Sequence, residues 1–420
     1  MQKATPEGKW YQGSIFVIYL MLVLFCLTFS QKLLDIPQNL PFLYVGLSLV
    51  LLHIFLLFLR FLYRGKSKIE TKFVFLVALL CAVFISALGD VRATKDYLIT
   101  GTAHLAFLFS FGVYLGRLRF DVLISRAAWA IVVFSLLEAT VAWLFLAGVE
   151  LTMASGTYYH QLIWGMRLHG IAGEPAHFGA IMGVSVLSVF FLYSSKTKGF
   201  SFLSVVVVVF LCASLLMSGT RNAIISTITG LVVFLKYKGR LRVPWYAWIV
   251  FFGAFSALLL IVSSETGDLI ANILRVGDSN SQDIRIEKLA NAFNFLSESS
   301  VIHLLFGYGF DYIINTPSFM NQYLSILIGF GLSGILCLLL LVDLVVKRLR
   351  VLLHSQRNIA AFGLALLSSS LVYFLMLSPL FGTFHIMTFA FYLAIFIAFS
   401  RYRIDKESTV TSNARQFETG

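Results

Sequence analysis

Long apolar runs separated by short polar connections make up most of the chain. Hydropathy predicts about twelve such runs, most with the roughly 18 to 25 apolar residues needed to cross ~30 Å of hydrocarbon. The predicted spans are 14–31, 40–63, 72–89, 97–116, 127–149, 172–194, 200–217, 223–237, 245–263, 321–346, 360–377 and 380–400. The pattern indicates an all-α polytopic bundle in which residues 1–420 form a single integral membrane domain.

One connection is much longer than the others and lies between the ninth and tenth predicted spans. This segment, 264–320, has 57 residues. Its apolar residues recur at helical spacing at Ile286, Leu289, Ala290, Phe293 and Leu296. The spacing predicts an amphipathic helix over 284–297 that lies on the outer surface or caps a cavity.

Basic residues are distributed unevenly between the two sides of this bundle. The chain is 59% hydrophobic and 12% charged, with a mean hydropathy of +0.88 and a net charge of +12. On one side lie 24 of the 32 Lys and Arg residues, in 1–13, 60–72, 117–126, 196–198, 236–242, 347–357 and the tail from Arg401. The positive-inside rule makes that side cytoplasmic, together with both termini. Topology thus explains the positive charge, and we expect no nucleic-acid partner.

Several kinds of chemistry are excluded by what the sequence lacks. The four cysteines lie within apolar runs without CxxC spacing, so we expect packing thiols and neither disulfide nor metal site. No GxxxxGK[ST] or DxD motif occurs, which argues against a P-loop ATPase and a metal-dependent nucleotide-sugar transferase. We expect no cofactor, and any donor substrate should arrive already activated within the membrane.

Three arginines are predicted on the outer side, where basic residues are scarce: Arg167, Arg221 and Arg285. Converging guanidinium groups would form a site for phosphate or another anion. Arg221 lies in a short outward turn, beside the hydroxyl donors of Ser218 and Thr220, and begins a helix whose N–H groups favour anions. A single arginine at this depth equally suits anchoring at lipid headgroups, and Arg285 can pair with a neighbouring carboxylate.

The segment before the sixth predicted span is rich in ionisable residues. Glu174 precedes Pro175, which suits the first turn of a helix, so Glu174 is either a structural cap or a general base. Partial removal from water raises a carboxylate's pKa and would favour the second role. His177 and His169 are alternative bases or ordinary hydrogen-bonding residues. Glu138 lies within a span, where it serves helix packing or a cavity.

These segments occur in an order that resembles a known family. They are Arg167 to Pro175 (R-x-x-G-x-x-x-E-P), Thr220 to Ala223 (T-R-N-A), Arg285 in the long loop, Gly307 to Gly309, Asn321 to Leu324 and Gly329 to Gly334. Together, over roughly 165–335, they resemble the O-antigen and exopolysaccharide polymerases (Wzy-type) of the O-antigen polymerase and ligase superfamily.

The resemblance implies a bacterial inner-membrane enzyme that works at the periplasmic face. It would transfer a growing glycan from undecaprenyl pyrophosphate to the next lipid-linked repeat unit, without metal or nucleotide. Its partners would be the lipid-linked donor and acceptor, membrane lipid and a chain-length regulator. Substrate binding would fall to Arg167, Arg221, Arg285, Ser218, Thr220 and Asn321, with Glu174 as the base and His177 and His169 behind it.

Two other functions compete with the polymerase. An O-antigen ligase or oligosaccharyltransferase would share the fold and the donor, but ligases of this superfamily carry a histidine where Met320 precedes Asn321. A transporter or flippase for an anionic glycan precursor is an alternative of another class. Transporters place their polar residues near the bilayer midplane, whereas this chain places them at the outer boundary. That distribution favours an enzyme.

Overall fold

The computed structural model describes residues 120–147, 168–170, 174–194, 202–238, 279–308, 321–375 and 385–399. All regular structure in these ranges is α-helical, which confirms the all-helical prediction there. The helices are α5 (Phe120–Leu146), α7 (Pro175–Ser194), α8 (Phe202–Met217), α9 (Arg221–Lys238), α12 (Ser279–Ser297), α13 (Val301–Phe306), α15 (Gln322–Ser355), α16 (Arg357–Phe374) and α17 (Ile386–Phe399). The predicted spans 14–31, 40–63, 72–89, 97–116 and 245–263 lie outside the described residues.

Four of the described helices are long and apolar enough to cross a membrane. They are Asp121–Leu146 of α5, Pro175–Ser194 of α7, Gln322–Ser355 of α15 and Arg357–Phe374 of α16. The apolar helices α8 and α17 are shorter. These helices support a multi-pass membrane protein, and the count of twelve spans stays a prediction.

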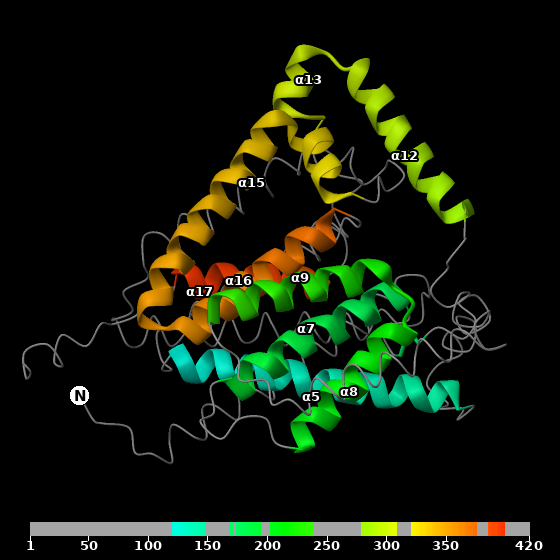
Figure 1. The fold of residues 1–420 in the computed structure, drawn as a ribbon. Helices are drawn as coiled ribbons and strands as arrows, with labels where there is room; N and C mark the ends of the chain where they lie inside the picture. The colour runs from blue at the N-terminus through cyan, green and yellow to red at the C-terminus, as the bar shows by residue number, and fades with distance from the viewer. Residues whose placement is uncertain are drawn as a thin grey trace, which may run out of the picture.

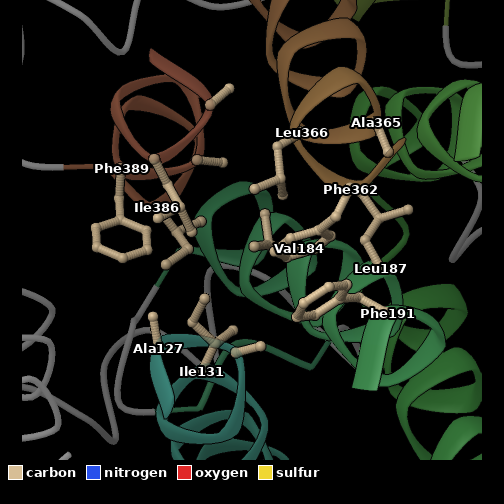
Figure 2. Packing of buried hydrophobic residues seen from close by; sticks show 14 of the residues in the cluster. Ala127, Ile131, Val184, Leu187, Phe191, Phe362, Ala365, Leu366, Ile386 and Phe389 are labelled. Carbon is tan, nitrogen blue, oxygen red and sulfur yellow. The ribbon is translucent and has the colours of Figure 1, made fainter. Parts of the chain in front are cut away.

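Helix α7 is at the centre of the main bundle. It contacts α5, α8, α9, α16 and α17, and its side chains are apolar around the whole circumference, as expected of a helix buried on every side. Figure 2 shows Val184, Leu187 and Phe191 of α7 facing side chains of α5, α16 and α17. Phe191 stacks on Phe362 of α16, with ring centroids 4.4 Å apart. The core of the bundle is therefore built around α7.

Small residues let α9 and the turn before it approach α7 closely. A Cβ atom added at Gly179 would lie 2.6 Å from the Oγ of Ser218, and one added at Gly183 would collide with Oγ1 of Thr227. The two glycines are four residues apart and so share one helix face, as in the small-residue interfaces of membrane helices. This close contact holds the start of α9 beside the start of α7.

Helix α15 bends sharply at Gly331, where φ is +66°. The backbone of α13 lies against this bend: a Cβ atom at Gly331 would collide with Leu305, and one at Gly307 would collide with Gly329. The N–H of Tyr308 donates to the carbonyl of Ile328 at 2.9 Å. The two glycine motifs of the sequence therefore touch each other. In Figure 1, α12, α13 and the upper part of α15 form an arch that stands away from the other helices, whereas the lower end of α15 packs on α16 and α17.

The amphipathic helix predicted over 284–297 is present as α12, and only part of its predicted apolar face is packed. Ala292 is buried and forms a small core with Leu324 and Ile328 of α15, whereas Leu289 and Phe293 of the predicted apolar face are exposed. Leu296 of the predicted face packs against the same small core together with Phe295, so α15 lies against one edge of the predicted face.

Three further helices differ from the pattern expected from hydropathy. Helix α5 begins at Phe120, seven residues before the predicted span 127–149. Helix α13 was not predicted, because its six residues are too few to show a period. Helix α15 continues to Ser355, about two turns beyond the predicted span, since the basic residues that follow the apolar run are good helix formers. Only Gln356 then separates α15 from α16.

Basic side chains close one end of the main bundle. The Nζ of Lys238 donates to the carbonyl of Ser194 at 3.1 Å, and the Nε of Arg357 donates to the carbonyl of Tyr237 at 2.7 Å. Cations at the last carbonyls of helices are favourable. The 20 residues of α7 place its start at the other end of the bundle, ~30 Å away.

Candidate functional site

Most of the predicted site residues within the described ranges gather at the end of the bundle opposite these basic side chains. Three hydrogen bonds tie its elements together. The hydroxyl of Thr220 donates to the carbonyl of Pro175 at 2.8 Å, and the hydroxyl of Tyr373 donates to the carbonyl of Ala176 at 3.0 Å. The amide Nδ2 of Asn321 donates to the carbonyl of Leu375 at 2.9 Å. We call this region the polar end; it joins the starts of α7, α9, α15 and α17 to the end of α16.

Glu174 occupies the N-cap position of α7. Its carbonyl accepts the N–H of Phe178 at 3.0 Å, and Pro175 follows it as the first residue of the helix. A carboxylate at this position is stabilised by the helix dipole. We expected this side chain to be partly desolvated, but it is exposed. Glu174 is both the helix cap and an accessible carboxylate.

The turn between α8 and α9 places Arg221 at the first position of α9, with an exposed side chain. Ser218 and Thr220 are buried in this turn. The hydroxyl of Ser218 donates to the carbonyl of Leu215 at 2.6 Å, just as that of Thr220 donates to Pro175. Their protons are thus used inside the protein. In this arrangement the two hydroxyls position the turn, and Arg221 presents the charge.

Glu138 of α5 lies beside Gly170, the glycine that follows His169 and adopts the left-handed region. Gly170 has a φ of +53°, and a Cβ atom there would lie 2.5 Å from Oε2 of Glu138. Both His169 and Glu138 are buried. The Nδ1 of His169 lies 3.2 Å from the carbonyl of Gly170, which can only accept, so Nδ1 carries the proton. The N–H of Leu168 donates to the carbonyl of Met217 at 3.0 Å, which attaches this segment to the turn before α9.

Buried His177 and Tyr373, together with half-buried His385, form a polar cluster between α7, α16 and the start of α17. The N–H of Met387 donates to Nδ1 of His385 at 3.1 Å, so in the neutral ring Nε2 carries the proton. That Nε2 lies 3.2 Å from the hydroxyl of Tyr373, whose own proton goes to Ala176. These bonds form a chain from α17 through α16 to the start of α7.

The ring of His177 lies edge-on to His385, with centroids 4.4 Å apart. His177 is 2% exposed, and its Nδ1 has no hydrogen-bond partner among the described residues. The ring therefore packs within the cluster and has little access to solvent.

Asn321 is the N-cap of α15. Its Oδ1 accepts the N–H groups of Tyr323 and Leu324 at 2.9 and 3.2 Å, while its Nδ2 binds the last turn of α16. Capping by asparagine is among the strongest helix-start signals. The asparagine that we predicted to bind substrate thus joins α15 to α16 at the polar end.

Two of the predicted site residues are not placed by these contacts. Arg167 lies outside the described residues, immediately before Leu168, and the side chain of Arg285 in α12 also lies outside them. Convergence of the three guanidinium groups stays a prediction. Within the described ranges, no group of three His, Cys, Asp or Glu residues is arranged to hold a metal ion.

Sequence reasoning assigned no site role to Tyr373 or His385. A signal was nevertheless present. A phenol buried in an apolar span needs a hydrogen-bond partner, and a polar residue just before an apolar helix is a candidate cap. What the sequence did not contain was the pairing of the two with each other and with Ala176, across 197 positions of the chain.

Comparison with known proteins adds no assignment to this geometry. No family model matches the chain, and no curated protein matches it.

Proposed function

We propose that the protein is a polysaccharide polymerase that elongates glycans carried on undecaprenyl pyrophosphate at the outer face of a bacterial inner membrane. The product would be O-antigen, capsule or exopolysaccharide. The observation that carries the proposal is that an exposed acidic residue, Glu174, and an exposed basic residue, Arg221, stand at the starts of two helices in contact, α7 and α9. The bond between Thr220 and Pro175 holds these helix starts together.

The proposed reaction needs a base and an anion site in one place. Glu174 takes the proton of the acceptor hydroxyl, whose oxygen attacks the anomeric carbon of the donor glycan. The bond between that carbon and the pyrophosphate oxygen breaks, and the pyrophosphate leaves with the electron pair. Arg221, with Arg167 and Arg285 as further candidates, stabilises the negative charge on the leaving oxygens.

The helix starts contribute to the same task. The first N–H groups of α7 and α9 open toward the polar end, and a helix N-terminus favours an anion such as phosphate. Both helices are long, with 20 and 18 residues. Their partial positive charge would assist the arginine in holding a pyrophosphate, without a metal ion.

Exposure favours Glu174 over the histidines as the base. A general base must come within hydrogen-bond reach of the hydroxyl that it deprotonates. Glu174 is exposed, whereas His177 and His169 are buried. The histidines fit better as residues that position the site. His169 does so through its contact with the carbonyl of Gly170, and His177 through its packing on His385.

A deletion strain examined for its surface polysaccharide tests the proposal. Loss of a polymerase leaves single repeat units attached in the surface polysaccharide and removes only the long chains. Loss of all repeat units would instead indicate a ligase or a flippase. Complementation with the wild-type gene should restore long chains, and complementation with Arg221→Ala should not.

A transporter of an anionic glycan precursor is the second candidate, because Glu138 is buried within the membrane-capable helix α5. Ionisable groups inside spans often mark transport pathways. The two candidates make opposite predictions for Glu138→Gln in the deletion strain. Normal long chains from this variant favour the polymerase, and loss of all repeat units favours the transporter.

A further inference from the structure

The arch displays an apolar surface that the described protein does not cover. None of the six residues of α13 is buried, and Val301, Ile302 and Phe306 are 71%, 70% and 68% exposed. We call the following residues the arch face: Leu289, Phe293, Val301, Ile302, Leu305 and Phe306. Four of these residues are neighbours on the single short helix α13, and an exposed apolar patch of this kind usually marks a binding partner or a membrane.

The arch face continues into the exposed apolar side of α15. The backbone of Leu305 lies against Gly331, and Leu332, the next residue along α15, is exposed. Leu336, Leu339 and Leu340 extend this exposed side along the helix. Because α15 is apolar enough to cross a membrane, its exposed leucines are lipid-facing, and α13 borders the same surface.

The length of α15 sets the depth of α13. Asp343 and Lys347 form an exposed ion pair of 2.7 Å that ends the apolar side of the helix. Twelve residues separate Gly331 from Asp343, which corresponds to ~18 Å along a helix. The hydrocarbon layer is ~30 Å thick. With the ion pair at one boundary, Gly331 and the helix packed on it lie within the layer, short of the far boundary.

Helix α13 is also built to tolerate such surroundings, where an unpaired backbone group is costly. The N–H of Gly307 donates to the carbonyl of His303 at 2.7 Å, and that of Tyr308 donates to Ile328 at 2.9 Å. At the other end, the hydroxyl of Ser300 caps the N–H of His303. The short helix therefore has bonded backbone groups at both ends.

We propose that the arch face inserts among the acyl chains of the bilayer leaflet farther from Asp343 and Lys347. The occupant is bilayer lipid, because the face is continuous with the lipid-facing side of α15 and lies at the depth of the hydrocarbon. The arch is thus embedded in the membrane. This position replaces the one expected from the sequence, in which the amphipathic helix lies on the outer surface or caps a cavity. This inference does not depend on the proposed chemistry.

Site-directed spin labelling of the full chain tests the insertion. A nitroxide is attached to Ile302→Cys, in a variant whose four native cysteines are replaced by alanine, and the protein is reconstituted in phosphatidylethanolamine and phosphatidylglycerol vesicles. Collisions with oxygen, which concentrates among acyl chains, are compared with collisions with a neutral, water-soluble nickel chelate. Asn291, exposed on α12, is labelled in the same way as the matched control.

We expect oxygen to exceed the nickel chelate at position 302 and the order to reverse at position 291. Greater access of nickel at position 302 would place the arch face in water and overturn the proposal. Low access of both reagents would show that protein, such as a second copy of the chain, covers the face, which also overturns it. Val301→Cys repeats the measurement, so that one misfolded variant does not decide the outcome.

Discussion

The side chains at the polar end of the bundle fall into two kinds. Glu174 and Arg221 are exposed, and each stands at a helix start where it can touch a substrate. Thr220, Tyr373 and His385 direct their hydrogen bonds to other parts of the protein. The first kind are candidates for catalysis and the second for positioning, and substitutions should separate them.

Arg221→Lys tests the anion site. A headgroup anchor needs only a positive charge on a long stem, so lysine would replace it with little loss. A pyrophosphate clamp needs the planar guanidinium and its paired donors. We expect Arg221→Lys to lose about 2 to 4 kcal/mol of transition-state stabilisation, or about 10² to 10³ in rate. Long-chain product on gels, at matched protein levels, measures the loss.

Arg348→Lys is the matched control for this substitution, because Arg348 is exposed on α15 near the opposite end of the bundle. It should polymerise normally. Arg167→Lys and Arg285→Lys extend the test to the arginines whose side chains lie outside the described residues. Wild-type chain lengths from two of the three variants (Arg167→Lys, Arg221→Lys and Arg285→Lys) would contradict the pyrophosphate clamp and favour the transporter.

Glu174→Gln tests the base. Glutamine keeps the size and the capping oxygen of glutamate but accepts no proton, so polymerisation should fall by about 10² to 10⁴. Glu174→Asp should retain some activity, since the carboxylate remains on a shorter stem. Normal product from the glutamine variant would reduce Glu174 to a helix cap and move the search to His177 and His169.

Tyr373→Phe tests the positioning chain. The change removes the donor to Ala176 and leaves the Nε2 proton of His385 without its acceptor, at a cost of about 1 to 3 kcal/mol. Tyr323→Phe removes one hydrogen bond, to the carbonyl of Leu371, and leaves no second donor without an acceptor. The loss of stability in this variant should therefore be smaller. Thermal unfolding in detergent compares the two variants. Equal melting temperatures would contradict the chain inferred from the histidine tautomer.

At the scale of elements, the fold depends on how closely helices approach one another. Helix α7 needs no polar face because other helices surround it, and α9 reaches it only where glycine removes the side chain. Since the start of α9 carries Arg221, this contact also sets the distance between the arginine and Glu174. Packing and site geometry are therefore coupled along one helix pair.

Gly183→Leu should break this coupling. The added side chain would enter the space of Thr227 and force α9 away from α7, at a cost of about 1 to 3 kcal/mol from overpacking. Both the melting temperature and the product length should fall. Ile228→Ala, on the exposed side of α9, should leave both nearly unchanged. A stable Gly183→Leu variant with normal product would show that the approach of the two helices is not required.

The hydropathy pattern predicted elements well where burial is uniform and poorly where only part of an apolar helix face is covered. The apolar runs that became α7, α8 and α16 begin and end within a few residues of the predicted bounds. For α12 the pattern identified the helix but only part of the face that packs. Ala292 is covered and Phe293 is exposed, because which of them is covered depends on where α15 lies. Helix α13 exists through contacts with α15 that no local period encodes.

For the whole molecule, the orientation in the membrane is the property on which the proposed function depends. Reporter fusions at Lys66, Lys238 and Arg350 should report the cytoplasm, and fusions at Ser155 and Ser279 should report the periplasm, as the distribution of basic residues predicts. Enzyme fusions active on only one side of the membrane make the measurement. A cytoplasmic result at Ser279 would separate Arg285 from the other arginines and end the three-arginine site.

The sequence alone determined the properties that follow from local composition. An unbroken apolar run can satisfy its backbone in a membrane only as a helix, so the described apolar helices could be predicted from hydropathy, although α5 begins before and α15 ends beyond the predicted bounds. Proline after Glu174 likewise indicated a helix start that the structure contains.

Only the tertiary structure decided what those helix ends do together. Thr220 was expected to donate to a substrate and instead donates to Pro175, and Tyr373 joins His385 to Ala176. Hydrogen bonds between residues far apart in the chain depend on distance in space, and one helix face can be covered or left open without any change in its own residues. The sequence holds the donors and the apolar stripes, and the packing of helix on helix assigns their partners.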